Sequence, residues 1–160
     1  MKSTIWGLLF AAVLFGMAGT VRADDTLDLS KAVKVGNGKT MVIEFTDPDC
    51  PFCRKAEAFF RGKTGVTRYI FLHSLAIHPG SKQKSQYILS MKDKAKAYEE
   101  ATSGAFDARK LKGITPAGVK LQEEQDRIAK ANKIRSTPTF MVYGRIIVGF
   151  DQKKLNQLIK

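Results

Sequence analysis

The alternation of apolar and polar residues predicts two strands around a helix near the middle of the chain. Residues 40–46 form a nearly continuous apolar run, which is typical of a strand covered on both faces. Residues 67–73 have the same character, and the segment between the two runs carries apolar side chains at helical spacing before it ends at Gly62. A strand, a helix and a strand in this order predict a βαβ unit with parallel strands and a right-handed crossover.

A hairpin is predicted on each side of this unit. The first joins a short strand at residues 32–35 to the strand at 40–46, because the Asn-Gly pair at 37–38 readily adopts the positive φ that a tight turn needs. The second spans residues 139–150 and turns at Gly144.

The stretch at about 79–134 is predicted to be a helical insertion. Gly104 and the segment from Gly113 to Gly118 separate its helices. A last helix of the chain is predicted after Asp151, which would be its N-cap. The insertion carries apolar residues at spacings of three and four in two stripes, Ile88, Met91, Ala95 and Tyr98, and Leu121, Ile128 and Ala131. The order hairpin, βαβ, insertion and ββα predicts an α/β fold with a central mixed β-sheet, a layout similar to that of thioredoxin-like proteins.

The first 23 residues are typical of a signal peptide. Lys2 precedes an uncharged, largely apolar run at residues 3–21, and Val21-Arg22-Ala23 offers the residues that a signal peptidase reads. Cleavage after Ala23 would leave residues 24–160 as one thioredoxin-like catalytic domain. The run is also about long enough to be an uncleaved membrane anchor. In both cases we expect the folded part outside the cytoplasm, in the periplasm, where disulfides persist.

Composition narrows the class of protein further. With 44% hydrophobic and 26% charged residues, the chain has the balance of a globular domain, which argues against disorder or a collagen-like structure. Lys and Arg outnumber Asp and Glu by 27 to 15. The lysines are scattered and accompany no nucleic-acid-binding motif, so we expect a solvated basic surface and no nucleic-acid partner. Two cysteines are too few for a disulfide-stabilised miniprotein or a four-thiolate zinc site.

The two cysteines form a Cys50-Pro51-Phe52-Cys53 motif where the first long strand passes into the helix. Pro51 suits the first helical position because it has no N–H to leave unpaired, which places Cys50 at the N-cap. There, unpaired backbone N–H groups and the helix dipole stabilise an exposed thiolate. Cys53, one turn further on, is expected to be shielded and able to resolve a mixed disulfide at Cys50. The motif therefore favours redox exchange over a structural disulfide or a metal site.

Acidic residues and a proline accompany this motif. Glu44 lies in the covered strand, where desolvation is expected to raise its pKa and let it accept the proton of Cys53 through a water. An ordinary strand glutamate paired with a lysine is the alternative. Asp47 and Asp49 are expected to be solvated, with weak effects on the thiols. Pro138, just before a strand, is consistent with a strand start or with a cis bond, and sequence alone favours trans.

The motifs resemble those of a known family. Residues 44–55, from Glu-Phe-Thr-Asp-Pro-Asp to Cys-Pro-Phe-Cys-Arg-Lys, resemble the active-site segment of periplasmic DsbC/DsbG-type thiol:disulfide interchange proteins. Ser136-Thr137-Pro138 is similar to the Thr-Pro loop of these proteins. The likeness covers about residues 30–160. It implies a thioredoxin fold with a cis bond at Pro138.

The resemblance also implies roles for individual residues. Cys50 would be the nucleophile and Cys53 the resolving thiol, which form the redox-active disulfide Cys50–Cys53. Thr137 would lie against the two sulfurs, with its backbone free to pair with an extended substrate chain. Pro51 and Phe52 are expected to complete the substrate-binding surface.

These features predict an exported thiol:disulfide oxidoreductase that reduces or isomerises protein disulfides without a cofactor. Its expected partners are disulfide-containing envelope proteins and a membrane-embedded thiol electron donor. Only residues 24 to about 39 precede the first core strand, so we expect a monomer without the family's N-terminal dimerisation domain.

Two other functions stay open. Glu44 resembles the buried acid of thioredoxins and DsbA-type oxidases, which makes a disulfide-donating oxidase one alternative. A non-enzymatic Cu(I) carrier that uses both thiolates is the other. For a metal site at the two thiolates in general, His73 and His78 are the candidate third ligands.

Overall fold

The computed structural model describes residues 27–159. In chain order its elements are η2 (Leu29–Lys31), β1 (Val33–Val35), β2 (Thr40–Thr46), α1 (Pro51–Phe60), β3 (Val66–Leu72), α2 (Ser81–Ser90), α3 (Lys94–Thr102), α4 (Pro116–Ala131), β4 (Thr139–Val142), β5 (Arg145–Val148) and α5 (Gln152–Leu158). The predicted strand at residues 40–46 is confirmed, and β3 begins and ends one residue earlier than predicted.

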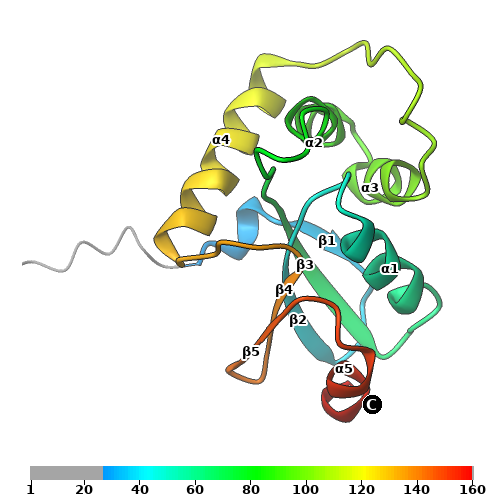
Figure 1. Cartoon of the computed structure of the whole chain (residues 1–160), viewed down its shortest axis with the longest axis vertical. Helices are drawn as coiled ribbons and strands as arrows, with labels where there is room; N and C mark the ends of the chain where they lie inside the picture. The colour runs from blue at the N-terminus through cyan, green and yellow to red at the C-terminus, as the bar shows by residue number, and fades with distance from the viewer. Residues whose placement is uncertain (1–26, 160) are drawn as a thin grey trace, which may run out of the picture.

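The strands form one mixed sheet in the order β1-β3-β2-β4-β5 (Figure 1). β2 and β3 run parallel, in register from Thr40↔Val66 to Thr46↔Leu72, and α1 connects them. β4 pairs antiparallel with β2, and the predicted hairpin between β4 and β5 is confirmed. The expected α/β fold with a central mixed sheet is therefore confirmed.

The first predicted hairpin is wrong. β1 pairs antiparallel with β3, with Val33 opposite Ile70, and does not pair with β2. Residues 36–39 instead cross the start of β3, where the Gly38 N–H donates to Val66 O at 3.3 Å. A Cβ on Gly38 would lie only 2.0 Å from the carbonyl carbon of Gly65. Gly38 therefore allows this segment to lie close to the backbone of Gly65, and it does not form the tight turn of a hairpin.

Helices cover the two faces of the sheet differently (Figure 1). α1 and α5 pack on one face, around Val42, Ala56, Phe60, Val66, Phe140, Val142, Ile147, Leu155 and Ile159. On the other face, Ala129 of α4 joins a cluster with Phe45 and Phe71. Because side chains alternate along a strand, Glu44 and Thr46 lie on the same face of β2 as Val42, toward α1.

The insertion consists of α2, α3 and α4, which lie together at one end of the sheet (Figure 1). Ile88 and Tyr98 are buried as predicted. Their stripe belongs to two helices, because Met91 ends α2 and the Asp93 carboxylate caps α3. The prediction for Ala131 is wrong: this residue is exposed at the end of α4.

Polar and small residues form the buried side of α4, which comprises Gly118, Gln122, Gln125 and Ala129. Gln125 is fully buried; its Oε1 accepts from the Leu72 N–H at 2.7 Å, and its Nε2 donates to Lys31 O at 2.5 Å. Gly118, predicted to separate helices, lies inside α4, where a Cβ would meet Ser90 Oγ at 2.0 Å. The buried amide of Gln125, which pairs with the backbone, therefore replaces part of the predicted apolar stripe, together with Gln122, whose Nε2 donates to Asp126 Oδ2.

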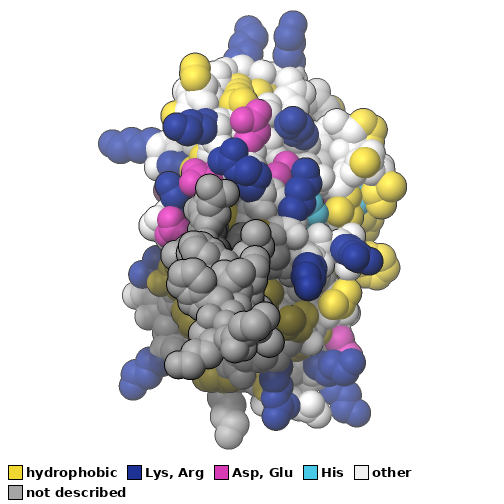
Figure 2. All heavy atoms as spheres, turned by 90° about the vertical axis from the view of Figure 1, so that its left-hand side faces the viewer, with side chains coloured by type: hydrophobic (Ala, Val, Ile, Leu, Met, Phe, Trp, Pro, Cys, Tyr) yellow, Lys and Arg dark blue, Asp and Glu magenta, His cyan; other side chains and the backbone are white. Residues whose placement is uncertain are grey.

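Within residues 27–159, no helix is long and apolar enough to cross a membrane. The predicted signal peptide, residues 1–23, lies outside the described residues. On the face shown in Figure 2, Lys and Arg side chains stand at separate points rather than in one continuous patch.

Candidate active site

The cysteine motif forms the start of α1, as predicted. Cys50 is the N-cap with extended backbone (φ −71°, ψ 123°), and Pro51 is the first helical residue. The Arg54 N–H donates to Cys50 O at 3.1 Å, which closes the first turn and brings Cys53 beneath the N-cap. Both thiols are free. The local sequence thus places two cysteines on one turn whose N-terminal N–H groups lack helical partners.

The two sulfurs differ in acidity. A hydrogen bond from the Cys53 thiol and the backbone N–H groups of Cys53 and Phe52 lower the pKa of Cys50 to about 5, although burial works against this. Burial and the neighbouring Cys50 raise the pKa of Cys53 well above its ordinary value. Cys50 is therefore the thiolate of the pair, and Cys53 keeps its proton.

Cys50 is less accessible than predicted. Only 4% of its surface is exposed, and Cys53 is fully buried. The exposed part of the motif is the dipeptide between them, with Phe52 57% exposed and Pro51 also at the surface. The reason is the loop before β4, which covers the N-cap: Cys50 Sγ lies 3.5 Å from Thr137 O.

That loop contains a cis peptide bond between Thr137 and Pro138. The cis geometry agrees with the family resemblance and not with the preference read from sequence alone. Thr137 is buried, and within the described residues its hydroxyl has no hydrogen-bond partner.

Glu44 of β2 is fully buried, as predicted. Its Oε2 accepts from Arg68 Nη1 at 3.2 Å, and the same nitrogen donates to Glu57 Oε2 at 2.7 Å. Desolvation raises the pKa of Glu44, with Arg68 opposing the rise and Glu57 adding to it. The Tyr98 hydroxyl, from α3, donates to Glu44 Oε1 at 3.4 Å. The ion-pair partner of Glu44 is therefore Arg68, where the alternative from the sequence was a lysine.

Comparison with known proteins agrees with this geometry. Residues 27–158 match the family model described as a thioredoxin-like domain. A solved disulfide interchange protein from Neisseria gonorrhoeae is 30% identical, with 82% of this chain and 98% of that chain covered and a TM-score of 0.70. The chain belongs to the thioredoxin-like thiol:disulfide interchange proteins.

Two other similar proteins show how far the likeness extends. The probable thiol:disulfide interchange protein DsbC of Bordetella avium is 29% identical over 116 residues, which are 71% of this chain. The match spans only 39% of the length of that relative. The catalytic domain of Proteus mirabilis ScsC shares the fold, with a TM-score of 0.65 at 19% identity over 84% of this chain and 90% of that chain.

In this thioredoxin-like protein Asp47 is not solvated, which corrects the prediction. It is fully buried, and its carboxylate accepts from the N–H groups of Asp49 and Leu75, both at 2.8 Å. His78 Nδ1 lies 3.0 Å from the same carboxylate, and the Asp47 N–H donates to Cys53 Sγ at 3.4 Å. Backbone donors compensate the burial of this charge and fix the segment before the N-cap.

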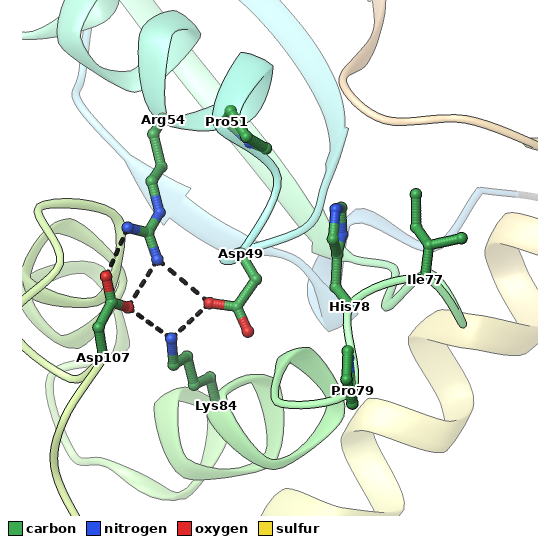
Figure 3. A pocket seen from close by; sticks show the side chains of 8 residues that line it. All are labelled: Asp49, Pro51, Arg54, Ile77, His78, Pro79, Lys84 and Asp107. Atoms are coloured by element: carbon green, nitrogen blue, oxygen red, sulfur yellow. Dashed lines mark hydrogen bonds and ion pairs between the residues drawn. The ribbon is translucent and has the colours of Figure 1, made fainter.

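An ion-pair cluster joins α1 to the insertion beside the cysteines (Figure 3). Arg54 contacts Asp107 through two bonds of 2.7 Å and Asp49 at 3.1 Å. Lys84 of α2 pairs with both carboxylates. These residues line a pocket of about 450 Å³ with Pro51, Ile77, His78 and Pro79. Lys84 and Asp107 had no sequence signal, because their pairing depends on how the insertion folds back onto α1.

The histidines considered as metal ligands have other partners. His73 Nδ1 lies 2.9 Å from Asp126 Oδ1, and His78 pairs with Asp47. Within residues 27–159, no group of three or more His, Cys, Asp and Glu side chains is arranged to hold a metal ion. The structure therefore gives no third ligand to the two sulfurs among the described residues.

Proposed function

We propose that the protein is an envelope thiol:disulfide oxidoreductase that reduces or isomerises protein disulfides through Cys50 and Cys53. The observation that carries this proposal is the opposite acidity of the two thiols on one helical turn, next to the cis peptide bond at Pro138. A single acidic thiol would suffice for modification or metal binding. A thiolate paired with a shielded thiol suits a two-step exchange.

In the first step the Cys50 thiolate attacks one sulfur of a substrate disulfide. A bond forms between Cys50 and that sulfur, and the other substrate sulfur leaves as a thiolate. In reduction, Cys53 loses its proton and attacks Cys50, which forms the Cys50–Cys53 disulfide and releases the second substrate sulfur. The substrate gains the two electrons that the cysteine pair loses. In isomerisation, another substrate thiolate displaces Cys50 instead.

Three neighbouring groups support the exchange. Glu44 is proposed to accept the Cys53 proton, because a buried carboxylate with a raised pKa is a suitable base near neutral pH. The Thr137 backbone is proposed to pair with an extended substrate chain, and the exposed Pro51 and Phe52 to contact its side chains.

We further propose that the protein acts in the periplasm after export and that a membrane-embedded thiol donor reduces it again. Both rest on the signal-like sequence at residues 1–23 and on the resemblance of residues 44–55 to periplasmic interchange proteins. The reduction potential decides the direction of electron flow. A value near −120 mV is typical of a strong oxidase such as DsbA, and one near −270 mV of the reductant thioredoxin.

Trapping of mixed disulfides tests the exchange. In a Cys53→Ser variant the resolving step is blocked, so Cys50 should remain bound to substrate proteins of an envelope extract. We expect adducts on non-reducing gels that disappear on reduction and are absent from the matched Cys50→Ser variant. If the Cys53→Ser variant forms no adducts and the wild type does not speed reduction of insulin disulfides, the proposed function is wrong.

A further inference from the structure

We infer that the Thr46 and Tyr98 hydroxyls carry the proton between Cys53 and Glu44, so that the helical insertion supplies a residue needed for the resolving step. This inference rests on the proposed exchange function. It replaces the water expected between Cys53 and Glu44 with two protein hydroxyls, and it gives α3 a role beyond packing.

The contacts form a continuous series. Cys53 Sγ accepts from the N–H of Asp47, the residue after Thr46, at 3.4 Å, and the Thr46 side chain lowers the pKa of Cys53 in opposition to burial. Thr46 Oγ1 lies 3.5 Å from Tyr98 Oη, which lies 3.4 Å from Glu44 Oε1. Hydroxyl groups both donate and accept, so each can pass one proton on as it receives another.

Burial separates this series from bulk water. Cys53, Thr46, Tyr98 and Glu44 each have no exposed surface. A proton that leaves Cys53 by direct transfer to solvent would have to pass the covered N-cap, where Cys50 is 4% exposed. The two hydroxyls offer a buried path from the end of β2 toward a base.

The charges around Glu44 favour proton uptake. Arg68 is the cation for two buried carboxylates, Glu44 and Glu57. With both carboxylates ionised this group has a net charge of −1, which is costly in a buried site. Uptake of one proton by Glu44 makes the group neutral. Release of this proton restores the base for the next resolving step, and in the reverse reaction protonated Glu44 returns the proton to Cys53.

Three proton transfers accompany the attack of Cys53 on Cys50. The Cys53 thiol gives its proton to Thr46 Oγ1, the Thr46 proton passes to Tyr98 Oη, and the Tyr98 proton passes to Glu44. The Cys53 sulfur then forms a bond with Cys50 Sγ, and the bond between Cys50 Sγ and the substrate sulfur breaks. The substrate sulfur leaves with the electron pair. Both hydroxyls end as they began, and Glu44 is protonated.

The Tyr98 hydroxyl can be removed while the packing of its ring is kept. Its ring packs in a cluster with Ile70, Leu72, Ile88 and Ala101, so Tyr98→Phe removes the hydroxyl and keeps the packing. Tyr87 of α2 packs against the same cluster, with its ring 5.1 Å from that of Phe106. Tyr87→Phe is therefore a matched control that removes a hydroxyl from the insertion but not from the path.

A single rapid-mixing experiment measures the rate of attack by Cys50 and the rate of resolution by Cys53. Reduced protein is mixed with an aromatic disulfide whose thiol product is coloured. Attack by Cys50 releases the first coloured thiol, and attack by Cys53 releases the second. We expect Tyr98→Phe and Thr46→Val to slow the second phase at least tenfold near neutral pH and to leave the first phase unchanged. Tyr87→Phe should leave both phases unchanged.

Two further readouts distinguish a proton path from a structural role. In the wild type the rate of the second phase should fall as acid protonates Glu44. In Tyr98→Phe and in Glu44→Gln the rate of this phase should no longer fall over the same pH range. The double variant that carries Tyr98→Phe and Glu44→Gln should be no slower than Glu44→Gln alone. Thermal unfolding of the Tyr98→Phe protein checks that its fold is retained.

The inference is overturned if folded Tyr98→Phe resolves at the wild-type rate with the wild-type pH profile. The proposed function is judged separately, by the wild type. A wild type without either phase refutes exchange itself, whereas two normal phases in both proteins leave exchange intact and remove Tyr98 from it.

Discussion

Reduced Cys50 should titrate near pH 5, and this value has a calculable effect on the chemistry. The same thiol has an ordinary pKa of 9.0, which the Cys53 thiol and the backbone N–H groups at the start of α1 lower. The difference corresponds to about 5 kcal/mol in favour of the thiolate, at about 1.4 kcal/mol for each tenfold change in an equilibrium constant. At pH 7 an ordinary thiol is almost all protonated, so about 3 kcal/mol of this preference is realised.

The stabilisation of the reduced protein by the Cys50 thiolate depends on pH. Because folding lowers the pKa of Cys50, the thiolate stabilises the reduced protein fully above pH 9 and loses this contribution as the pH falls through about 5. The oxidised protein has no thiolate and gains nothing. At pH 7 the Cys50–Cys53 disulfide should therefore be more oxidising, by about 60 mV, than it would be with an ordinary Cys50 thiol.

Ultraviolet absorbance of the thiolate measures the titration directly. We expect a midpoint near pH 5 in the reduced wild type and a higher midpoint in Cys53→Ala, which lacks the thiol that donates to Cys50. The Cys50→Ala control should show no titration in this range, since the pKa of Cys53 is raised. A wild-type midpoint near 9.0 would refute the reasoning, because the start of α1 would then give the sulfur no special acidity.

Two further changes test the surroundings of the site. Arg68→Met leaves Glu44 and Glu57 buried without their cation and should lower the free energy of unfolding by about 3–5 kcal/mol at pH 7. The loss should shrink as the pH falls and Glu44, whose pKa burial raises, takes up a proton; an equal loss at pH 7 and at pH 5 in urea unfolding would contradict this. Gly118→Ala puts a Cβ 2.0 Å from the Ser90 hydroxyl and 2.9 Å from its backbone nitrogen, so α2 and α4 must separate. We expect a loss of about 1–3 kcal/mol, and an unchanged Tm would rule out the close contact.

The sequence was most informative where local rules decide the structure. Pro51 fixes the start of α1 and so the N-cap position of Cys50, and the apolar run of β2 decides the burial of Glu44. Features that depend on distant segments were not predictable. The solvated role expected of Asp47 was wrong, since donors from another loop surround it. Tyr98 had the spacing of a core residue, and only the packing of α3 on the sheet places its hydroxyl next to Glu44.

The hydrogen bonds of Gln125 limit how far the domain can be reduced in size. A shortened protein that joined β3 directly to β4 would leave the Leu72 N–H and the Lys31 carbonyl without their partner at the edge of the core. It would also uncover Phe45 and Phe71, which pack with Ala129. Attempts to build a minimal redox module from this chain should therefore retain α4, or supply an amide and an apolar cover in its place.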